Sequence, residues 1–201
     1  MARTKKSERT RKMIIEKSAP LFNRNGFHGT SMSDILQATG LTKGGVYGNF
    51  SGKEELALEA FEWNKEKLFD ALHERVSKKR ETLEKLRTFF KAHGIVILEF
   101  PGGCPVLNAA IDSDSNFPEL KKRVQEAMQV WTSYLERVIR IGIQKGEVRP
   151  EVDADRIARN LVAMLEGAVF MGRLLEQPEA YKEMVEHILR AIDFELLPFD
   201  A

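Results

Sequence analysis

Residues 26–53 read GFHGTSMSDILQATGLTKGGVYGNFSGK, and this stretch decides the fold prediction. A short helix is expected after Thr30-Ser31, because Ser31 followed three residues later by Asp34 forms a capping-box pattern. That helix stops at Thr39-Gly40, where the glycine suits a tight turn. Thr42 is a good N-cap for a second short helix that runs to Phe50. The order of two short helices around a tight turn predicts a helix-turn-helix.

Apolar residues recur at helical spacing on both sides of this stretch, and period-2 alternation is nearly absent. Upstream, a helix is expected over residues 7–25, with Gly26 as a left-handed C-cap. Downstream, Ser51-Gly52-Lys53-Glu54 is a second capping-box pattern that opens a long helix to about residue 79. Further helices are predicted over about residues 83–100, from Pro105, and over about 117–146, 154–175 and 178–195. The fold class is therefore all-α, with about nine helices.

Charge is divided unevenly along the chain, although the net charge is only +1. Residues 1–53 contain ten Lys and Arg and three Asp and Glu. The remaining residues contain 21 Lys and Arg and 27 Asp and Glu. A basic N-terminal segment followed by an acidic remainder suggests a polyanion as the partner of that segment. The single Cys104 and the lack of a signal-peptide or membrane-spanning stretch predict a cytoplasmic protein that does not enter a membrane.

The residues around the second short helix suit contact with DNA. Lys43 and Gly44 lie in its expected first turn, where free amides and missing side chains let a phosphate approach closely. Tyr47 offers a hydroxyl on a rigid ring, and Asn49 can donate or accept a hydrogen bond at a base edge. Lys53, at the start of the next helix, is placed for another backbone contact. This segment is therefore predicted to bind double-stranded DNA.

The sequence in this region resembles the DNA-binding signature of the TetR (tetracycline-repressor-like) family over roughly residues 9–56. The resemblance is carried by Thr30, Ile35, Gly40-Leu41-Thr42-Lys43-Gly44, Tyr47, Phe50 and Lys53-Glu54-Glu55-Leu56. Two positions depart from the family pattern: Asn49 stands where His is common, and Leu36 stands where Ala is common. The expected DNA-contacting set is Ser33, Thr42, Lys43, Gly44, Gly45, Tyr47, Asn49 and Lys53.

The resemblance also implies two domains: a DNA-binding domain over residues 1–53, with a basic arm at 1–8, and a helical ligand-sensing and dimerisation domain over 54–201. It implies a homodimer through the last two helices. Along them recur Ile157, Leu161, Leu165, Ala168 and Gly172, then Tyr181, Met184, Ile188 and Ile192. A small-molecule effector of unknown identity would release a repressor from a pseudo-palindromic operator. The candidate effector-binding residues are Phe89, Phe90, His93, Ile97, Cys104, Met128, Trp131, Tyr134, Met164 and Phe170.

Several alternatives remain open at this stage. Cys104 precedes Pro105 at an expected helix N-terminus, where a thiolate is stabilised, so the protein could sense electrophiles or oxidants through it. The chain could instead be a helical protein-interaction module, or an activator rather than a repressor. An enzyme is not expected, because the four histidines have no metal-ligand spacing and no catalytic constellation, metal site or cofactor motif is recognised. Asp112 and Asp114 are interpreted as a solvated segment at a helix end.

Overall fold

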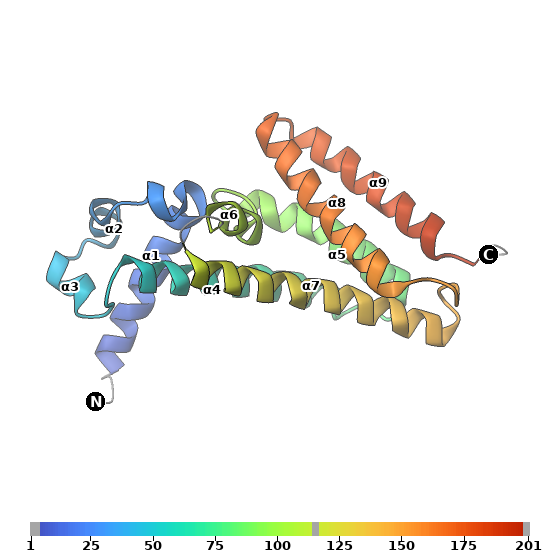
Figure 1. Cartoon of the computed structure of the whole chain (residues 1–201), viewed down its shortest axis with the longest axis horizontal. Helices are drawn as coiled ribbons and strands as arrows, with labels where there is room; N and C mark the ends of the chain where they lie inside the picture. The colour runs from blue at the N-terminus through green and yellow to red at the C-terminus, as the bar shows by residue number, and fades with distance from the viewer. Residues whose placement is uncertain (1–4, 114–116, 199–201) are drawn as a thin grey trace. The chain divides into compact units, whose positions relative to one another are not determined.

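The structure, a computed structural model, describes residues 5–113 and 117–198 (Figure 1). Within these ranges it contains nine helices and no strand, which confirms the all-α prediction. None of the described helices is long and apolar enough to cross a membrane. The helices are α1 (Lys5–Gly29), α2 (Met32–Thr39), α3 (Lys43–Tyr47), α4 (Lys53–Val76), α5 (Thr82–Glu99), α6 (Pro105–Asp112), α7 (Pro118–Lys145), α8 (Ala154–Leu174) and α9 (Pro178–Leu196).

The chain packs into two compact units. The first, here called the head, combines the chain up to Lys67 with Phe100–Val124, and the second, the body, combines Leu68–Glu99 with the chain from Gln125. This division by packing differs from the functional division at residue 53, which remains a prediction. The helix α4 contributes its first part to the head and its last part to the body.

The core of the head joins the helix-turn-helix to its neighbours. Ile14 of α1, Ile35 of α2, Val46 of α3 and Leu56 of α4 are buried together with Phe50, which follows α3. Each helix contributes one apolar face to this cluster, so the short helices α2 and α3 are held by packing rather than by their own helix propensity.

The predicted caps of the short helices are present. The Ser31 side chain accepts a hydrogen bond from the Asp34 backbone N–H, and the Asp34 carboxylate accepts one from the Ser31 N–H. Thr42 accepts from the N–H of Gly45 at the start of α3. The capping box expected between Ser51 and Glu54 forms with a different carboxylate. The Ser51 N–H donates to the Glu55 carboxylate at 2.7 Å and not to Glu54.

The regular helix breaks at Gly26, where it was predicted to end, but a further helical turn follows. The helix α1 thus runs to Gly29 across a kink at Gly26, where φ is 74° and ψ is 177°. The Asp112 carboxylate accepts a hydrogen bond from the Phe27 N–H at this kink, and a Cβ added to Gly26 would lie 2.8 Å from Asp112 Oδ1. The interpretation of Asp112 as a solvated residue is therefore wrong, whereas Asp114 lies outside the described residues.

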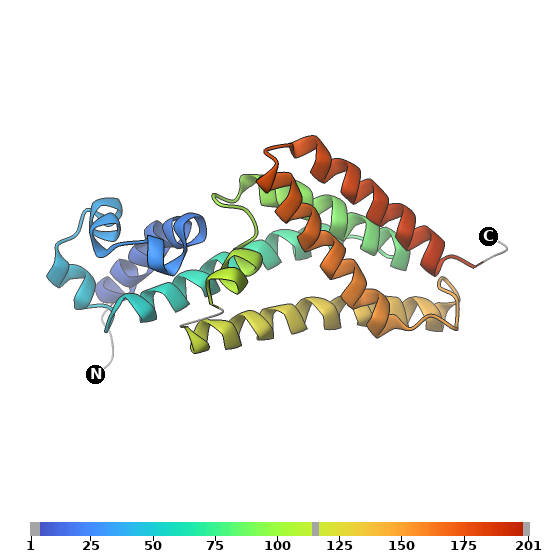
Figure 2. The same cartoon turned by 45° about the horizontal axis from the view of Figure 1, so that its top comes forward.

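The body is built from α5, the larger part of α7, α8 and α9 with the end of α4. In Figure 2, α8 and α9 run side by side, joined by a short connection. Small residues allow this packing: a Cβ at Gly94 of α5 would lie 2.5 Å from Tyr181 Cε1, and one at Gly172 of α8 would lie 3.0 Å from Tyr181 Cβ. Tyr181 of α9 is thereby fitted between α5 and α8, where it is buried.

Candidate DNA-binding surface and effector cavity

The helix α3 presents its polar face to solvent and buries the other. Val46 is 2% exposed, whereas Tyr47 is 42% exposed. Thr42, Lys43 and Gly44 are exposed as well, and the Lys43 ammonium lies 5.7 Å from the centre of the Tyr47 ring. A phenol and an ammonium group held next to each other on a short exposed helix offer two donors to phosphate oxygens.

The surface around Gly44 is open. A Cβ added there would meet nothing within 4 Å, and no left-handed backbone angle is present at this residue. Neither packing nor backbone conformation within the protein therefore requires glycine, which costs about 1 kcal/mol relative to alanine in a helix. Ser33 of α2 is also exposed.

Two residues of the predicted DNA-contacting set use their side chains inside the head. Asn49 donates from Nδ2 to the Gly45 carbonyl at 2.9 Å, which caps the C-terminal end of α3. Lys53 donates to the carbonyls of Phe27 at 2.8 Å and Thr30 at 3.1 Å, and its ammonium lies 4.2 Å from the centre of the Phe27 ring. Lys53 thus ties the start of α4 to the segment between α1 and α2.

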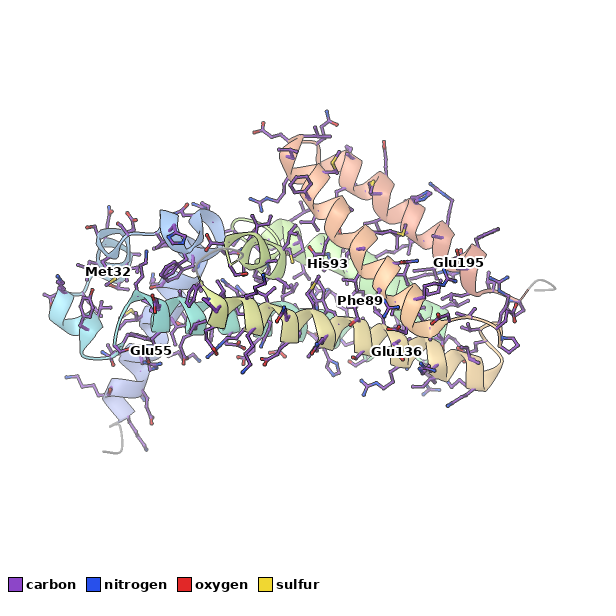
Figure 3. All side chains as sticks on the ribbon, viewed as in Figure 1. Met32, Glu55, Phe89, His93, Glu136 and Glu195 are labelled. Atoms are coloured by element: carbon purple, nitrogen blue, oxygen red, sulfur yellow. The ribbon has the colours of Figure 1, made fainter. Side chains whose placement is uncertain are left out.

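An arginine that the sequence prediction did not include anchors the segment after α3. Arg11 donates to the Asn49 carbonyl at 2.5 Å and to Glu55 Oε1 at 2.7 Å, and its guanidinium lies over the Phe50 ring. The pKa of Glu55 is lowered from 4.5 to about 2, first because the Ser51 backbone N–H donates to it and further because Arg11 lies beside it. Glu55, labelled in Figure 3, therefore stays ionised and fixes the turn between α3 and α4.

The described part of the body contains a cavity of about 490 Å³. Trp131 packs against Phe69 with ring centres 5.4 Å apart and against Phe89 at 6.3 Å, and Phe89 lies 6.0 Å from Tyr134. These four rings make the cavity largely aromatic, which is typical of small-molecule sites. It is lined by Phe69, Leu72, His73, Val76, Phe89, Val130, Trp131, Ser133, Tyr134 and Arg137.

Three of the predicted effector-binding residues, Phe89, Trp131 and Tyr134, line this cavity together. The prediction missed the contribution of α4, although Phe69, Leu72, His73 and Val76 follow helical i, i+3, i+4, i+7 spacing. It also missed Arg137, which lies on α7 one turn beyond Ser133 and Tyr134.

The other predicted effector-binding residues lie elsewhere. Phe90 is fully buried in the body core, Met128 and Met164 are half-buried, and Phe170 is exposed. Ile97 lines a second body cavity of about 230 Å³ with Gly94, Leu98, Val169, Gly172, Arg173, Glu176 and Tyr181. Cys104 belongs to the head, where it is fully buried and precedes α6. Redox-sensing thiols are accessible and of low pKa, so burial does not favour the sensing alternative.

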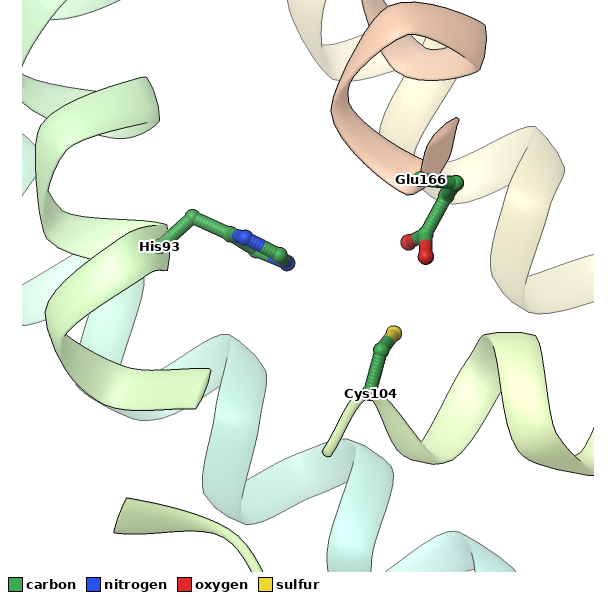
Figure 4. A group of neighbouring side chains, drawn as sticks. All are labelled: His93, Cys104 and Glu166. Atoms are coloured by element: carbon green, nitrogen blue, oxygen red, sulfur yellow. The ribbon is translucent and has the colours of Figure 1, made fainter. Parts of the chain in front are cut away.

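His93 lies in the body core and not in the 490 Å³ cavity. Its Nδ1 atom is 3.3 Å from the Tyr181 hydroxyl, and its ring is 5.5 Å from the centre of the Trp131 ring. A carboxylate oxygen of Glu166 lies within 4.8 Å of a nitrogen of the ring (Figure 4). Complete burial lowers the pKa of His93 to about 3, so the ring is neutral at neutral pH.

The stripes predicted for the dimer seam are mostly interior to the single chain. Leu161 and Leu165 of α8 and Ile188 and Ile192 of α9 are buried within the protomer. The correction follows from helix geometry, because these residues occupy the face on which α8 and α9 pack against the body itself. A different surface is apolar and exposed, comprising Phe170, Met171 and Leu174 of α8, Leu175 directly after α8, and Phe194 of α9.

Comparison with known proteins agrees with this architecture. A family model described as bacterial regulatory proteins, tetR family, matches residues 14–60, and one described as tetracyclin repressor-like, C-terminal domain, matches residues 82–188. The repressor DhaR from Mycobacterium sp. strain GP1 is 24% identical over 98% of this chain and 96% of its own length.

Two solved structures are similar over nearly the whole chain. A TetR transcriptional regulator from Chloroflexus aurantiacus J-10-FL is 37% identical, with a TM-score of 0.92 over 96% of this chain and 99% of its own. A TetR-family regulator from Cytophaga hutchinsonii is 34% identical, with a TM-score of 0.92 over 98% of this chain and 100% of its own. The family consists of transcriptional regulators that bind DNA operators and act as dimers, and ligand-responsive repression is typical of it. With both family models matched and these identities over almost its full length, the chain belongs to the TetR family of helix-turn-helix transcriptional regulators.

Proposed function

We propose that this regulator binds a pseudo-palindromic operator in the cytoplasm as a homodimer and that a small molecule in the body cavity releases it. The observation that carries the proposal is the exposed polar face of α3, set on a buried core, in the same chain as an aromatic cavity of about 490 Å³. The cavity falls within the size range of sites that bind small molecules.

The proposed contacts to DNA fall into two groups. Ser33, Thr42, Lys43, Gly44 and Tyr47 approach the duplex directly, because their exposed side chains or bare backbone face solvent. Gly45, Asn49 and Lys53 lie beside them. Lys53 has three N–H donors, two of which bind Phe27 and Thr30, so one donor remains for a phosphate.

The predicted basic arm has a smaller structural counterpart than expected. Its residues 1–4 lie outside the described residues, and the chain is already helical from Lys5. Lys5 and Lys6 are exposed at the start of α1 and add positive charge to the head. Any contribution of the arm to phosphate binding would appear as a steeper dependence of affinity on salt.

The proposed dimer surface is the exposed stripe on α8 and α9. Ala163, Gly167, Phe170 and Leu174 follow one another at intervals of three and four residues along α8, and a Cβ at Gly167 would meet nothing within 4 Å. Phe194 of α9 is 79% exposed. An exposed apolar stripe with small residues lets two copies of a helix pair approach closely as a four-helix bundle.

The DNA-binding proposal is tested by selection from a library of genomic fragments at two salt concentrations, followed by sequencing of the retained fragments. We expect enrichment of a short inverted repeat, and we expect Lys43→Ala and Tyr47→Phe to abolish it. Lys122→Ala serves as the control, because it removes the same charge from an exposed site on α7 of the head. If retention of the fragments depends only on salt and the retained fragments share no sequence, specific operator recognition is refuted and a protein-interaction role is favoured.

A further inference from the structure

The cavity of the body has an apolar floor and a polar rim. Leu72, Val76, Phe89 and Trp131 are each at most 3% exposed and form the floor. Its polar side chains, those of His73, Ser133 and Arg137, are exposed. A ligand in such a cavity buries an apolar portion and keeps one polar group near the mouth.

The charge at this rim is positive. None of the lining residues is a carboxylate, and Arg137 carries the one permanent charge among them. Two acidic neighbours on the same helices are paired, since Glu136 binds Arg140 at 2.7 Å and Glu74 binds Lys78 at 3.2 Å. Among the described residues, Arg137 makes no ion pair, and its guanidinium lies 6.0 Å from the centre of the Tyr134 ring.

We infer that the cavity binds an aromatic monocarboxylate, whose ring lies against Trp131 and Phe69 and whose carboxylate pairs with Arg137. This inference rests on the proposed function, because it assigns the chemical class of the effector. The planar guanidinium matches a carboxylate with two parallel hydrogen bonds, which adds both energy and orientation.

The phenol at the rim supports the same assignment. Tyr134 is half-buried, and burial raises the pKa of its hydroxyl, so the group stays protonated at neutral pH and donates to a carboxylate oxygen. An organic cation would also find aromatic faces here, which attract positive charge. The guanidinium of Arg137 repels such a cation, however, and the lining offers no carboxylate to neutralise it.

The experiment compares three probes that share a naphthalene ring and differ in charge by calorimetric titration of the full chain. The probes are 2-naphthoate, 2-naphthamide and (2-naphthylmethyl)trimethylammonium, all at one ionic strength. We expect 2-naphthoate to bind about tenfold more tightly than the amide, and the ammonium probe to bind most weakly. The preference for 2-naphthoate should shrink as salt is added, because Arg137 is exposed.

Two matched variants locate the carboxylate. Arg137→Gln should weaken 2-naphthoate binding about tenfold and leave 2-naphthamide unchanged. Arg190→Gln removes the same charge from an exposed site on α9, outside the cavity lining, and should change neither. Both side chains are exposed, so circular dichroism should show unchanged folding.

The other outcomes overturn the inference. Tightest binding of the ammonium probe would make the cavity a site for cations, and equal binding of the three probes would make it purely apolar. Failure of all three to bind, with operator recognition intact, would refute this ligand class and leave the DNA-binding role standing. Conversely, Arg137-dependent binding of 2-naphthoate by a chain that recognises no operator would support the ligand class and refute the proposed function.

Discussion

Arg11 and Lys53 show that basic residues of the N-terminal segment can bind the protein's own backbone. Both direct their charged groups to backbone carbonyls of the head, and Arg11 also binds the Glu55 carboxylate. Positive charge counted along the sequence therefore overstates the number of phosphate contacts. The slope of affinity against salt should reflect the residues exposed around α3, such as Lys43, more than the total charge of the segment.

The carboxylate of Glu55 should stabilise the head in a pH-dependent way. Its pKa is lower in the folded protein than its usual 4.5, so its contribution is present above about pH 4.5 and is lost as the pH falls toward 2. We expect Glu55→Gln to lower the free energy of unfolding by about 1–2 kcal/mol at pH 7, after allowance for solvent screening, and by roughly half as much at pH 3. Urea unfolding at both pH values measures this difference.

Glu54→Gln is the control for Glu55→Gln, because Glu54 is the exposed neighbouring residue. It removes an acidic group from the same first turn of α4, so it also corrects for the interaction with the helix dipole. An equal loss of stability in both variants, or a loss at pH 3 as large as that at pH 7, would argue against the Arg11–Glu55–Ser51 anchor.

At the scale of an element, α3 combines low intrinsic stability with an exposed surface. It is five residues long, contains Gly44 and Gly45, and is held in place by its N-cap Thr42 and the buried Val46. An isolated helix of this length does not persist in water, so its form depends on the head core. The glycine at position 44 is unexplained by anything within the protein and fits the close approach of another molecule.

The variant Gly44→Ala separates these two roles. We expect it to raise the free energy of unfolding by up to about 1 kcal/mol, because alanine is the better helix former and the added methyl group meets open space. We also expect it to weaken binding to the selected operator severalfold, since the methyl group would hold a phosphate or base edge away. Thermal unfolding and fluorescence anisotropy on labelled operator report the two effects. Unchanged operator affinity would show that the backbone at Gly44 does not approach DNA.

Capping residues next to each helix account for most of the helix boundaries that the sequence predicted correctly. The starts of α2, α3 and α6 followed from Ser31, Thr42 and Pro105, because caps act on the residues next to them. The helical turn beyond Gly26 was missed because the kink is completed by Asp112, which is 85 residues away from Phe27 in sequence. The four α4 residues of the cavity were missed for a related reason, since their side chains reach Phe89 and Trp131 only after tertiary packing.

At the scale of the whole molecule, the proposed function needs two copies of the chain. One α3 helix offers few contacts, and a two-fold dimer doubles them on a palindromic site. Most of the α8 and α9 residues that the resemblance assigned to the seam are buried in the single chain, so the proposed dimer uses the exposed stripe instead. A pattern of apolar residues predicts that a face is buried, but not whether its own chain or a second copy covers it.

Leu174→Glu should disrupt the dimer. Leu174 is 64% exposed in the single chain, and a two-fold interface would contain the new charge twice. We expect the dissociation constant to rise at least about tenfold in sedimentation experiments, with a matching loss of operator affinity. Ile111→Glu is the control, because Ile111 is also 64% exposed but lies on α6 of the head. A dimer unaffected by Leu174→Glu would place the interface elsewhere.

The central claim is that occupation of the body cavity lowers the affinity of the head for its operator. The most direct measurement places a permanent occupant at the rim: Ser133→Cys is labelled with a naphthyl maleimide, and its operator affinity is compared before and after labelling. Arg140→Cys, labelled outside the cavity lining, is the control, and the native Cys104 is buried. With Trp63 replaced by Phe so that Trp131 is the remaining tryptophan, quenching of its fluorescence verifies that the naphthyl group enters the cavity. The account predicts a fall of at least about fivefold in operator affinity on labelling Ser133→Cys alone. Unchanged affinity with the naphthyl group inside the cavity would contradict it.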